Sequence, residues 1–135
     1  MKKIFLNNII IILLFPVFGQ FSDYTGVVNF NVSTDREDYR VGESIKIIFD
    51  FDIKNKFHIY SSDTTKAPKT GETYTEYYDS TLFDNIQNIV EPETITKFDQ
   101  NFNQETSYHE GKFQLYQVGI LNDSINPSNY KVEGT

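Results

Sequence analysis

The sequence contains no cysteine, no tryptophan and only one methionine. Without cysteine, these residues hold no disulfide, no thiolate metal site, no iron–sulfur cluster and no thiol nucleophile. Basic residues are also scarce, because 12 Lys and Arg stand against 19 Asp and Glu, which gives a net charge of −7. Duplex binding needs cations that neutralise phosphates, so this balance argues against a nucleic-acid partner.

The first nineteen residues have the layout of a secretory signal peptide. A cationic start, Met1–Lys3, precedes an apolar run, Ile4–Phe18, and a small residue, Gly19, that suits cleavage. The apolar run is shorter than the roughly twenty residues that a membrane-spanning helix needs, so we expect a cleaved leader rather than an anchor. Residues 20–135 are then one exported acidic domain, large enough to bury a core without a metal or disulfide.

Alternation of apolar and polar residues predicts a chain made of short strands. The two clearest patterns are Gly26–Val32 and Ile45–Ile53. Further candidates are Phe57–Tyr60, Thr73–Tyr78, Ile86–Val90, Phe113–Val118 and Tyr130–Thr135. No window has the 3.6-residue period of an amphipathic helix. The sequence therefore predicts an all-β fold, an antiparallel β-sandwich.

Two segments between these strands are predicted as loops. Thr64–Gly71 contains Pro68 and no periodic apolar residues, so we expect an exposed loop. Glu93–Glu110 is polar with isolated aromatic residues, so we expect a long excursion rather than a core element. The last strand pattern, Tyr130–Thr135, is not followed by a turn. We therefore expect the chain to be a fragment that lacks its final strands.

The histidines and serines do not form a recognisable metal or nucleophile pattern. His58 and His109 are the only histidines, and we interpret them as a half-buried strand histidine and an exposed loop histidine. Ser61 and Ser62 follow His58 closely, but neither lies in a nucleophile elbow. Adjacent residues of a strand also face opposite sides. We expect neither a metal site nor a hydrolase.

Carboxylates and tyrosines provide two further candidate surfaces. Glycoside hydrolysis needs two carboxylates that face each other, and we interpret the available acids as solvated surface groups. These acids are Glu91, Glu93, Asp99 and Glu105. Tyr74, Tyr77 and Tyr78 offer stacking surfaces for a sugar or a partner protein. Alternation places Tyr74 and Tyr78 on one face and Tyr77 on the other, so part of this set is expected in the core.

Six short segments occur in an order that resembles a known family. They are Ile47–Ile53, Lys56–Ser61, Pro68–Thr70, Val90–Pro92, Lys97–Phe102 and Tyr108–Tyr116. Their order and spacing are similar to the N-terminal periplasmic domain of the thiol:disulfide interchange protein DsbD. Members of that family carry a strand, a signature like G-W-H-I-Y-S and a loop like P-x-P-T in this order. The resemblance covers residues 26–135, nearly all of the chain after the leader.

This resemblance implies an immunoglobulin-like sandwich that passes electrons between periplasmic thiol–disulfide proteins without a cofactor. The implied partners are the thioredoxin-like domain of the same parent chain, disulfide isomerases and cytochrome c maturation factors. In the family, the exchanging cysteine pair follows a strand that matches Tyr130–Thr135, so we expect the pair beyond Thr135. The present chain alone is then inactive, and only later regions attach the protein to a membrane.

The resemblance also implies a small set of site residues. The family shields its cysteines with a cap loop that bears an aromatic residue, and Phe102, shortly after Asp99, falls at this place. Such a cover must dock and lift. Alternatively, Phe102 is a loop residue plugged into the end of the sandwich. His58 and Tyr60 lie on the signature strand, where Tyr60 either lines the same region or is ordinary core.

Two functions from different classes remain open. The first is a truncated electron-relay domain of a DsbD-like reductase. The second is a secreted, non-catalytic immunoglobulin-like module for binding or adhesion. Two closely spaced cysteines after Thr135 would distinguish the first function from the second.

Overall fold

The computed structural model describes residues 3–5 and 26–126, and these residues form nine strands and one 3₁₀ helix. The strands are β1 (Lys3–Phe5), β2 (Val28–Thr34), β3 (Asp38–Arg40), β4 (Ser44–Ile53), β5 (Ile59–Tyr60), β6 (Phe83–Ile86), β7 (Ile95–Asp99), β8 (Gln104–His109) and β9 (Lys112–Leu121), and the helix η1 covers Ser80–Leu82. All strand pairs are antiparallel. The predicted antiparallel all-β fold is confirmed, and the arrangement is consistent with a β-sandwich.

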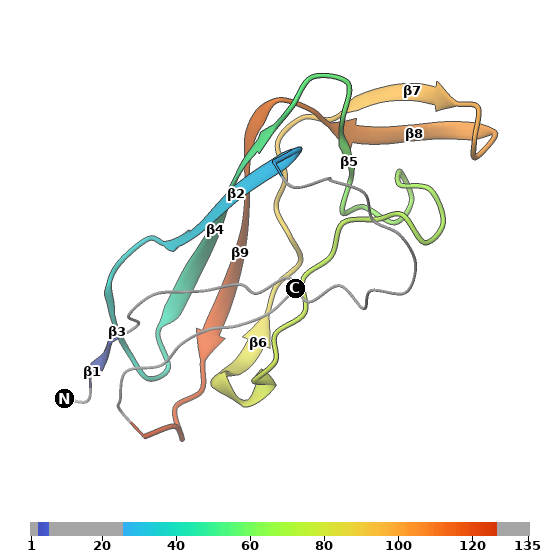
Figure 1. Ribbon diagram of the computed structural model, residues 1–135. Coiled ribbons are helices and arrows are strands. Elements are labelled where there is room, and N and C mark those ends of the chain that lie inside the picture. Colours follow the sequence, from blue (N-terminus) through green and yellow to red (C-terminus); the bar gives the residue numbers. More distant parts are fainter. Residues whose placement is uncertain (1–2, 6–25, 127–135) are drawn as a thin grey trace.

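The main sheet contains four strands in the order β2-β4-β9-β6, with the two longest strands in its centre (Figure 1). Strands β4 and β9 pair over nine residue pairs. On one face of this sheet, Phe30, Phe51 and Phe113 stack across three strands, with ring centroids 5.8 and 5.1 Å apart. His109 continues the stack, because its ring lies 4.7 Å from that of Phe113. The stack links the main sheet to β8.

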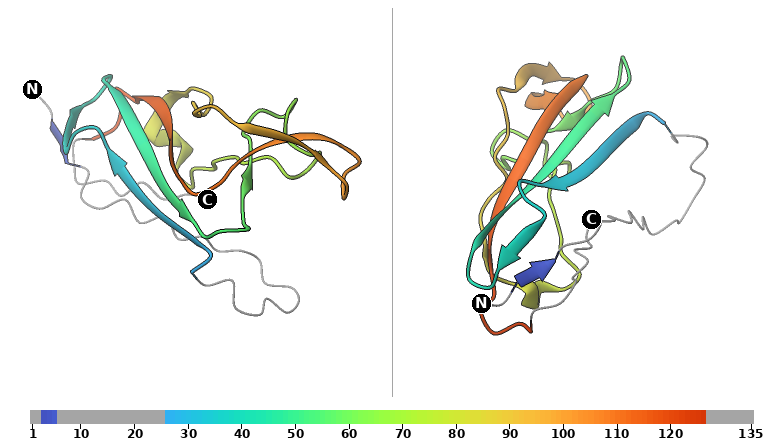
Figure 2. Two further views of the ribbon diagram at one scale, coloured as in Figure 1. Left: turned by 90° about the horizontal axis from the view of Figure 1, so that it is seen from above. Right: turned by 90° about the vertical axis from the view of Figure 1, so that its left-hand side faces the viewer.

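A smaller sheet, in the order β5-β8-β7, lies beyond one end of the main sheet. Its β7–β8 hairpin projects away from β4 and β9 (Figure 1 and the left view of Figure 2). The chain passes from β8 to β9 at Gly111, whose φ of 70° is a left-handed conformation that glycine adopts without strain. The Ile53 N–H donates a hydrogen bond of 2.9 Å to the Gly111 carbonyl. The corner between the sheets is therefore held at the end of β4.

Strands β1 and β3 form a separate pair, with Ile4 opposite Tyr39. Lys3–Phe5 is the part of the predicted signal peptide that falls within the described residues. The rest of residues 1–19 lies outside them, as does the predicted strand Tyr130–Thr135. Within the described ranges, no helix has the length and apolar character needed to cross a bilayer.

The hydrophobic core lies between the central strands and the segment that leads into β6. Its buried side chains are Tyr39, Ile45, Ile47, Phe49, Leu82, Phe83, Leu115 and Leu121. The residues from β4 occupy every second position, as the alternating pattern predicts. Each fully buried aliphatic or aromatic side chain contributes about 1.5–3 kcal/mol of transfer free energy. The core is therefore built on β4 and β9 and closed by η1 and β6.

Three sequence predictions of local structure are wrong. Thr73–Tyr78 is not part of any named strand, although its residues favour β-structure. Glu93–Glu110 is not a loop, because it contains the β7–β8 hairpin. The signature strand is shorter than predicted, since β5 contains Ile59 and Tyr60 alone, and His58 precedes it. In each case pairing with a neighbouring strand, which propensity does not report, decides the outcome.

Gly119→Ala is expected to lower the free energy of unfolding by about 1–3 kcal/mol, because overpacking a core forces side chains from their rotamers. The added Cβ would lie 2.9 Å from both Ile86 Cδ1 and Phe83 Cδ1. Urea unfolding followed by circular dichroism measures the loss. In the double variant, Phe83→Leu should relieve part of the overlap, so the loss in free energy of unfolding should be smaller than the sum of the two single losses. Strictly additive losses would contradict the predicted overlap.

Candidate functional site

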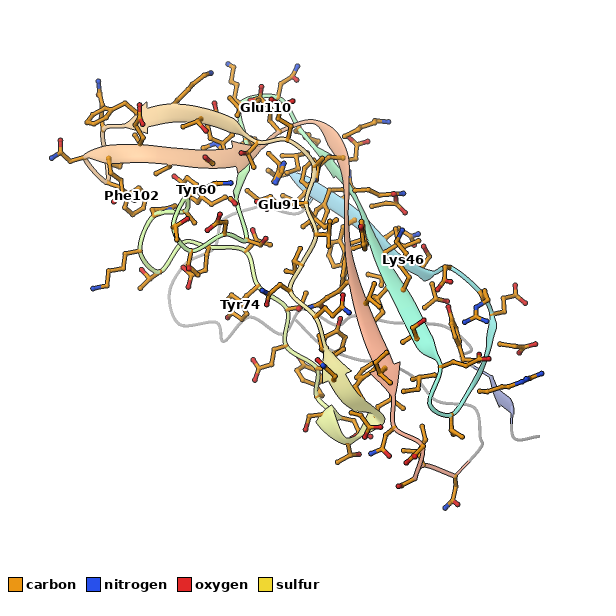
Figure 3. The ribbon with its side chains drawn as sticks, turned by 180° about the vertical axis from the view of Figure 1, so that it is seen from behind. Lys46, Tyr60, Tyr74, Glu91, Phe102 and Glu110 are labelled. Atoms are coloured by element: carbon orange, nitrogen blue, oxygen red, sulfur yellow. The ribbon has the colours of Figure 1, made fainter. Side chains whose placement is uncertain are left out.

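The four residues that the family resemblance implies, His58, Tyr60, Asp99 and Phe102, lie together beside the β7–β8 hairpin. Tyr60 is on β5, Asp99 ends β7, Phe102 lies at the hairpin tip, and His58 precedes β5. The Tyr60 hydroxyl donates a hydrogen bond of 2.7 Å to Asp99 Oδ2. The Phe102 ring meets the Tyr60 ring edge-on, with centroids 5.9 Å apart (Figure 3). We call these four residues the tip cluster.

Asp99 also shapes the turn that carries Phe102. Its Oδ1 accepts a hydrogen bond of 2.9 Å from the Asn101 N–H, while Oδ2 binds Tyr60. Asn103 completes the turn with a φ of 52°, a left-handed conformation that asparagine tolerates better than most residues. One carboxylate therefore holds the tip in shape and ties it to β5.

The Phe102 side chain is not plugged into the end of a sheet. It is 45% exposed, and its ring contact is with Tyr60. Phe98, on β7 of the same hairpin, is 58% exposed. The tip therefore presents an aromatic residue that covers Tyr60 on one side and meets solvent on the other.

The electrostatics of the tip cluster follow from the bond between Tyr60 and Asp99. Desolvation by burial, together with the hydrogen bond to the Asp99 carboxylate, raises the pKa of Tyr60 to about 12. The same hydrogen bond lowers the pKa of Asp99 from its ordinary value. At neutral pH, Tyr60 is therefore a neutral donor and Asp99 an ionised acceptor.

Two further aromatic contacts extend the tip cluster along β8. The His58 ring lies 4.9 Å from the Tyr60 ring and 4.6 Å from the Tyr108 ring. Lys97 Nζ lies 5.8 Å from the centre of the Tyr108 ring, within the range of a cation–π contact. Tyr60 and Tyr108 are direct partners in the β5–β8 register, so they share one face of the sheet.

The opposite face of this sheet holds a polar network that the sequence analysis did not find. The Glu91 carboxylate accepts hydrogen bonds from the Ser61 hydroxyl, from the Ser62 N–H at 2.9 Å, from the Ser62 hydroxyl at 3.0 Å and from His109 Nε2 at 3.2 Å. Burial opposes ionisation, but these donors outweigh it and lower the pKa of Glu91. We call Glu91, Ser61, Ser62 and His109 the carboxylate network.

In the carboxylate network, both serine hydroxyls donate to the Glu91 carboxylate rather than to a histidine. Ser61 is fully buried, so its oxygen has no access to a substrate, whereas Ser62 is half-buried. His109 faces an ionised carboxylate, which only accepts, so its Nε2 carries the proton.

The environments of the two histidines are the reverse of those predicted. His109 lies on β8 and is 3% exposed, whereas His58 is an exposed residue outside the strands. The partners of His109 are Glu91, eighteen positions before it, and Phe113 on β9. Nothing in the sequence around His109 signals these partners.

The predicted tyrosine surface is divided as the alternation indicates. Tyr74 and Tyr78 are exposed, while Tyr77 packs edge-on against Phe83 at 5.3 Å and donates to Gln117 Oε1 at 2.7 Å. Tyr74 lies at the side of a groove of about 660 Å³ (Figure 3). The groove residues are Ser62, Asp63, Thr64, Thr73, Tyr74, Thr75, Asn88, Ile89, Val90, Glu91 and Gln117.

The remaining predicted acids do not join a site. Glu93 and Glu105 are exposed. Among residues 26–126, no three histidine, aspartate or glutamate side chains are grouped so that they could hold a metal ion. The tip cluster and the tyrosine groove are thus the two candidate surfaces.

Comparisons of this chain with protein-family models, with curated proteins and with solved structures find no match. The class of protein that the fold defines is an antiparallel all-β domain. Its function has to be argued from the tip cluster, the carboxylate network and the groove.

Asp99→Asn is expected to lower the pKa of Tyr60 from about 12 toward its ordinary value of 10, because loss of the anionic acceptor makes the phenolate less unfavourable. Burial remains, so the pKa should stay above 10. Absorbance of tyrosinate during alkaline titration measures it, with Tyr60→Phe subtracted to isolate this residue and circular dichroism to verify the fold. An unchanged titration in Asp99→Asn would show that the hydrogen bond is absent.

Proposed function

We propose that this chain is the N-terminal part of an immunoglobulin-like thiol–disulfide exchange domain of the DsbD type, exported to the periplasm. One observation carries the proposal: the hairpin tip closes onto Tyr60 through one hydrogen bond from Tyr60 to Asp99 and one ring contact from Phe102. The sequence resemblance independently assigns Phe102 to a cap loop over the cysteine pair.

The contacts at the tip suit a cover that opens and closes. A cover over a reactive dithiol must exclude other thiols while closed and must expose the sulfur atoms to a partner. Phe102 has an apolar ring in an otherwise polar turn. The turn is attached to Tyr60 through the half-buried hydrogen bond from Tyr60 to Asp99 and through the edge-on contact of the Phe102 ring. Such contacts are weak enough to break without unfolding the sheets.

The chemistry of this function requires residues beyond Thr135. The chain contains no thiol, so the exchanging cysteine pair would follow Thr135, as the resemblance implies. A thioredoxin-like domain of the same parent protein would reduce that disulfide, and the resulting thiolate would attack the disulfide of a periplasmic partner. No cofactor is needed, because electrons move with the thiol–disulfide exchange itself.

The test begins with the coding sequence after codon 135, where we expect two closely spaced cysteines. In the reduced full-length protein, Phe102→Ala should raise the rate of thiol alkylation by iodoacetamide about two- to tenfold, since an aromatic contact is worth about 0.5–1.5 kcal/mol. Phe98→Ala is the matched control, because Phe98 is exposed on the same hairpin. A reading frame without cysteines, or equal rates for Phe102→Ala and wild type, would overturn the proposal.

A secreted binding module is the second candidate, and the exposed ring of Tyr74 favours it. Tyr74 is 68% exposed beside a groove whose described residues carry hydroxyl, amide and carboxylate groups and include no lysine, arginine or histidine. An acidic protein with such a groove suits a neutral, hydroxyl-rich ligand better than an anion. The ring face would stack on a sugar, and the hydroxyl groups would bind its oxygens.

If the groove binds sugars, Tyr74→Ala should weaken binding of cellohexaose, maltohexaose or chitohexaose about tenfold, which corresponds to one lost stacking contact. Isothermal titration calorimetry measures the affinity. Tyr78→Ala serves as the control, because Tyr78 is exposed but does not line the groove. Absence of binding by all three oligosaccharides would remove this candidate.

A further inference from the structure

The residues that follow Tyr60 and Tyr108 in sequence are both held by one carboxylate. Tyr60 and Tyr108 form a cross-strand pair on the face that carries the tip cluster. Successive side chains of a strand point to opposite faces, so Ser61 and His109 turn toward the other face. There they meet Glu91, which contacts Ser61 and His109 at the same time.

We infer that Glu91 is the positioning residue of the tip cluster, acting on Tyr60 through Ser61, Ser62 and His109 from the opposite face of the β5–β8 sheet. The inference concerns the geometry of Tyr60 and does not depend on the proposed redox function. Figure 3 shows Glu91 near the junction of the two sheets, whereas Tyr60 and Phe102 lie together toward the hairpin tip.

Strand β5 needs such an anchor because it is only two residues long. Beyond its pairing with β8, its neighbours are held by the bond from the Ser61 N–H to the Ser107 carbonyl, and by Thr73, which donates to the carbonyls of Tyr60 and Ser61. These contacts hold the backbone of Tyr60 and Ser61 through hydrogen bonds to neighbouring backbone and to Thr73. Glu91 adds three side-chain contacts and one backbone contact from another direction.

The carboxylate is itself held in place by the main sheet. His109 donates to Glu91, and the His109 ring stacks on Phe113 of β9, which in turn stacks on Phe51 of β4. The Val90 N–H donates to the Tyr116 carbonyl at 2.8 Å, so the residue before Glu91 is bonded directly to β9. Glu91 therefore connects β5 to the central strands of the main sheet.

The consequence for Tyr60 is geometric. Its hydroxyl lies 2.7 Å from Asp99 Oδ2, and hydrogen bonds weaken steeply when the donor moves or turns away. A shift of β5 relative to β8 would separate Tyr60 from Asp99 and from Phe102 together. Loss of the Glu91 contacts should therefore loosen the tip cluster, although Glu91 touches none of its side chains.

The test replaces Glu91 with glutamine, which keeps the size of the side chain but offers only one acceptor oxygen to the donors. In Glu91→Gln, the Tyr60 titration should shift from about 12 toward 10, and the nuclear Overhauser contacts between the Tyr60 and Phe102 rings should weaken at least twofold. Ser62→Ala, which removes one hydroxyl donor, should produce a smaller shift in the same direction.

A matched control separates positioning from general loss of stability. Leu115→Ala removes a buried side chain of the main-sheet core, and this core includes no residue of the tip cluster or the carboxylate network. We expect Leu115→Ala to lower the urea midpoint at least as much as Ser62→Ala or Glu91→Gln does. Its Tyr60 titration and its Tyr60–Phe102 nuclear Overhauser contacts should nevertheless remain those of wild type. Equal changes in Leu115→Ala, or unchanged Tyr60 signals in both network variants, would overturn the inference. If Glu91→Gln does not fold, Ser62→Ala decides alone.

Discussion

The antiparallel ladder between β4 and β9 is the constraint on which the rest of the structure depends. The two strands pair over nine residue pairs, and a slip by one residue would turn the whole buried row of β4 to the opposite face. Ile45, Ile47 and Phe49 of β4 are all buried, so such a one-residue slip would expose three core side chains. Strands β2 and β6 then add to the outer edges of this pair, and η1 with β6 closes the core over it. The ladder thus determines where β9 begins, and so where β8 and the hairpin must lie.

The candidate site is placed by polar and aromatic contacts rather than by the hydrophobic core. From the start of β9, the chain turns at Gly111 into β8, and the hairpin extends beyond the main sheet (Figure 1). Buried serine, threonine and histidine replace aliphatic residues in β8, so its position depends on partners that satisfy them. Glu91 is the partner of His109, and the Thr96 hydroxyl is the partner of the Ser107 hydroxyl. No buried side-chain nitrogen or oxygen among the described residues lacks a partner. Hydrogen bonds are directional, so they fix the orientation of these side chains more closely than apolar packing does. A binding or catalytic site needs side chains that are oriented in this way.

The sequence predicts the strands in which apolar and polar side chains alternate. It does not predict the strand in which polar side chains are buried. β2, β4 and β9 follow from their apolar periodicity, and the loop at Thr64–Gly71 follows from Pro68. The loop is not exposed throughout, because Ala67 and Pro68 are buried. The β7–β8 hairpin could not be predicted in this way, because Thr106, Ser107 and His109 are polar and yet buried, so β8 has no apolar alternation. The carboxylate network joins positions 61, 91 and 109, and the tip cluster joins positions 60 and 99, so both depend on tertiary pairing. Phe102, Asp99 and Tyr60 came from the resemblance, whereas Glu91 had been interpreted as a solvated acid.

The two faces of the β5–β8 sheet differ in strength, and this difference has a physical consequence. On one face, four hydrogen bonds to the half-buried Glu91 carboxylate hold Ser61, Ser62 and His109, and breaking them would leave the buried Ser61 and His109 without these partners. On the other face, the hairpin tip is held by the edge-on contact of the Phe102 ring and by one hydrogen bond from Tyr60 to Asp99. In the proposed function, the hairpin tip would leave Tyr60 while the contacts of Glu91 keep β5 and β8 in place. Reversible covering of a surface requires this combination of a fixed base and a separable tip.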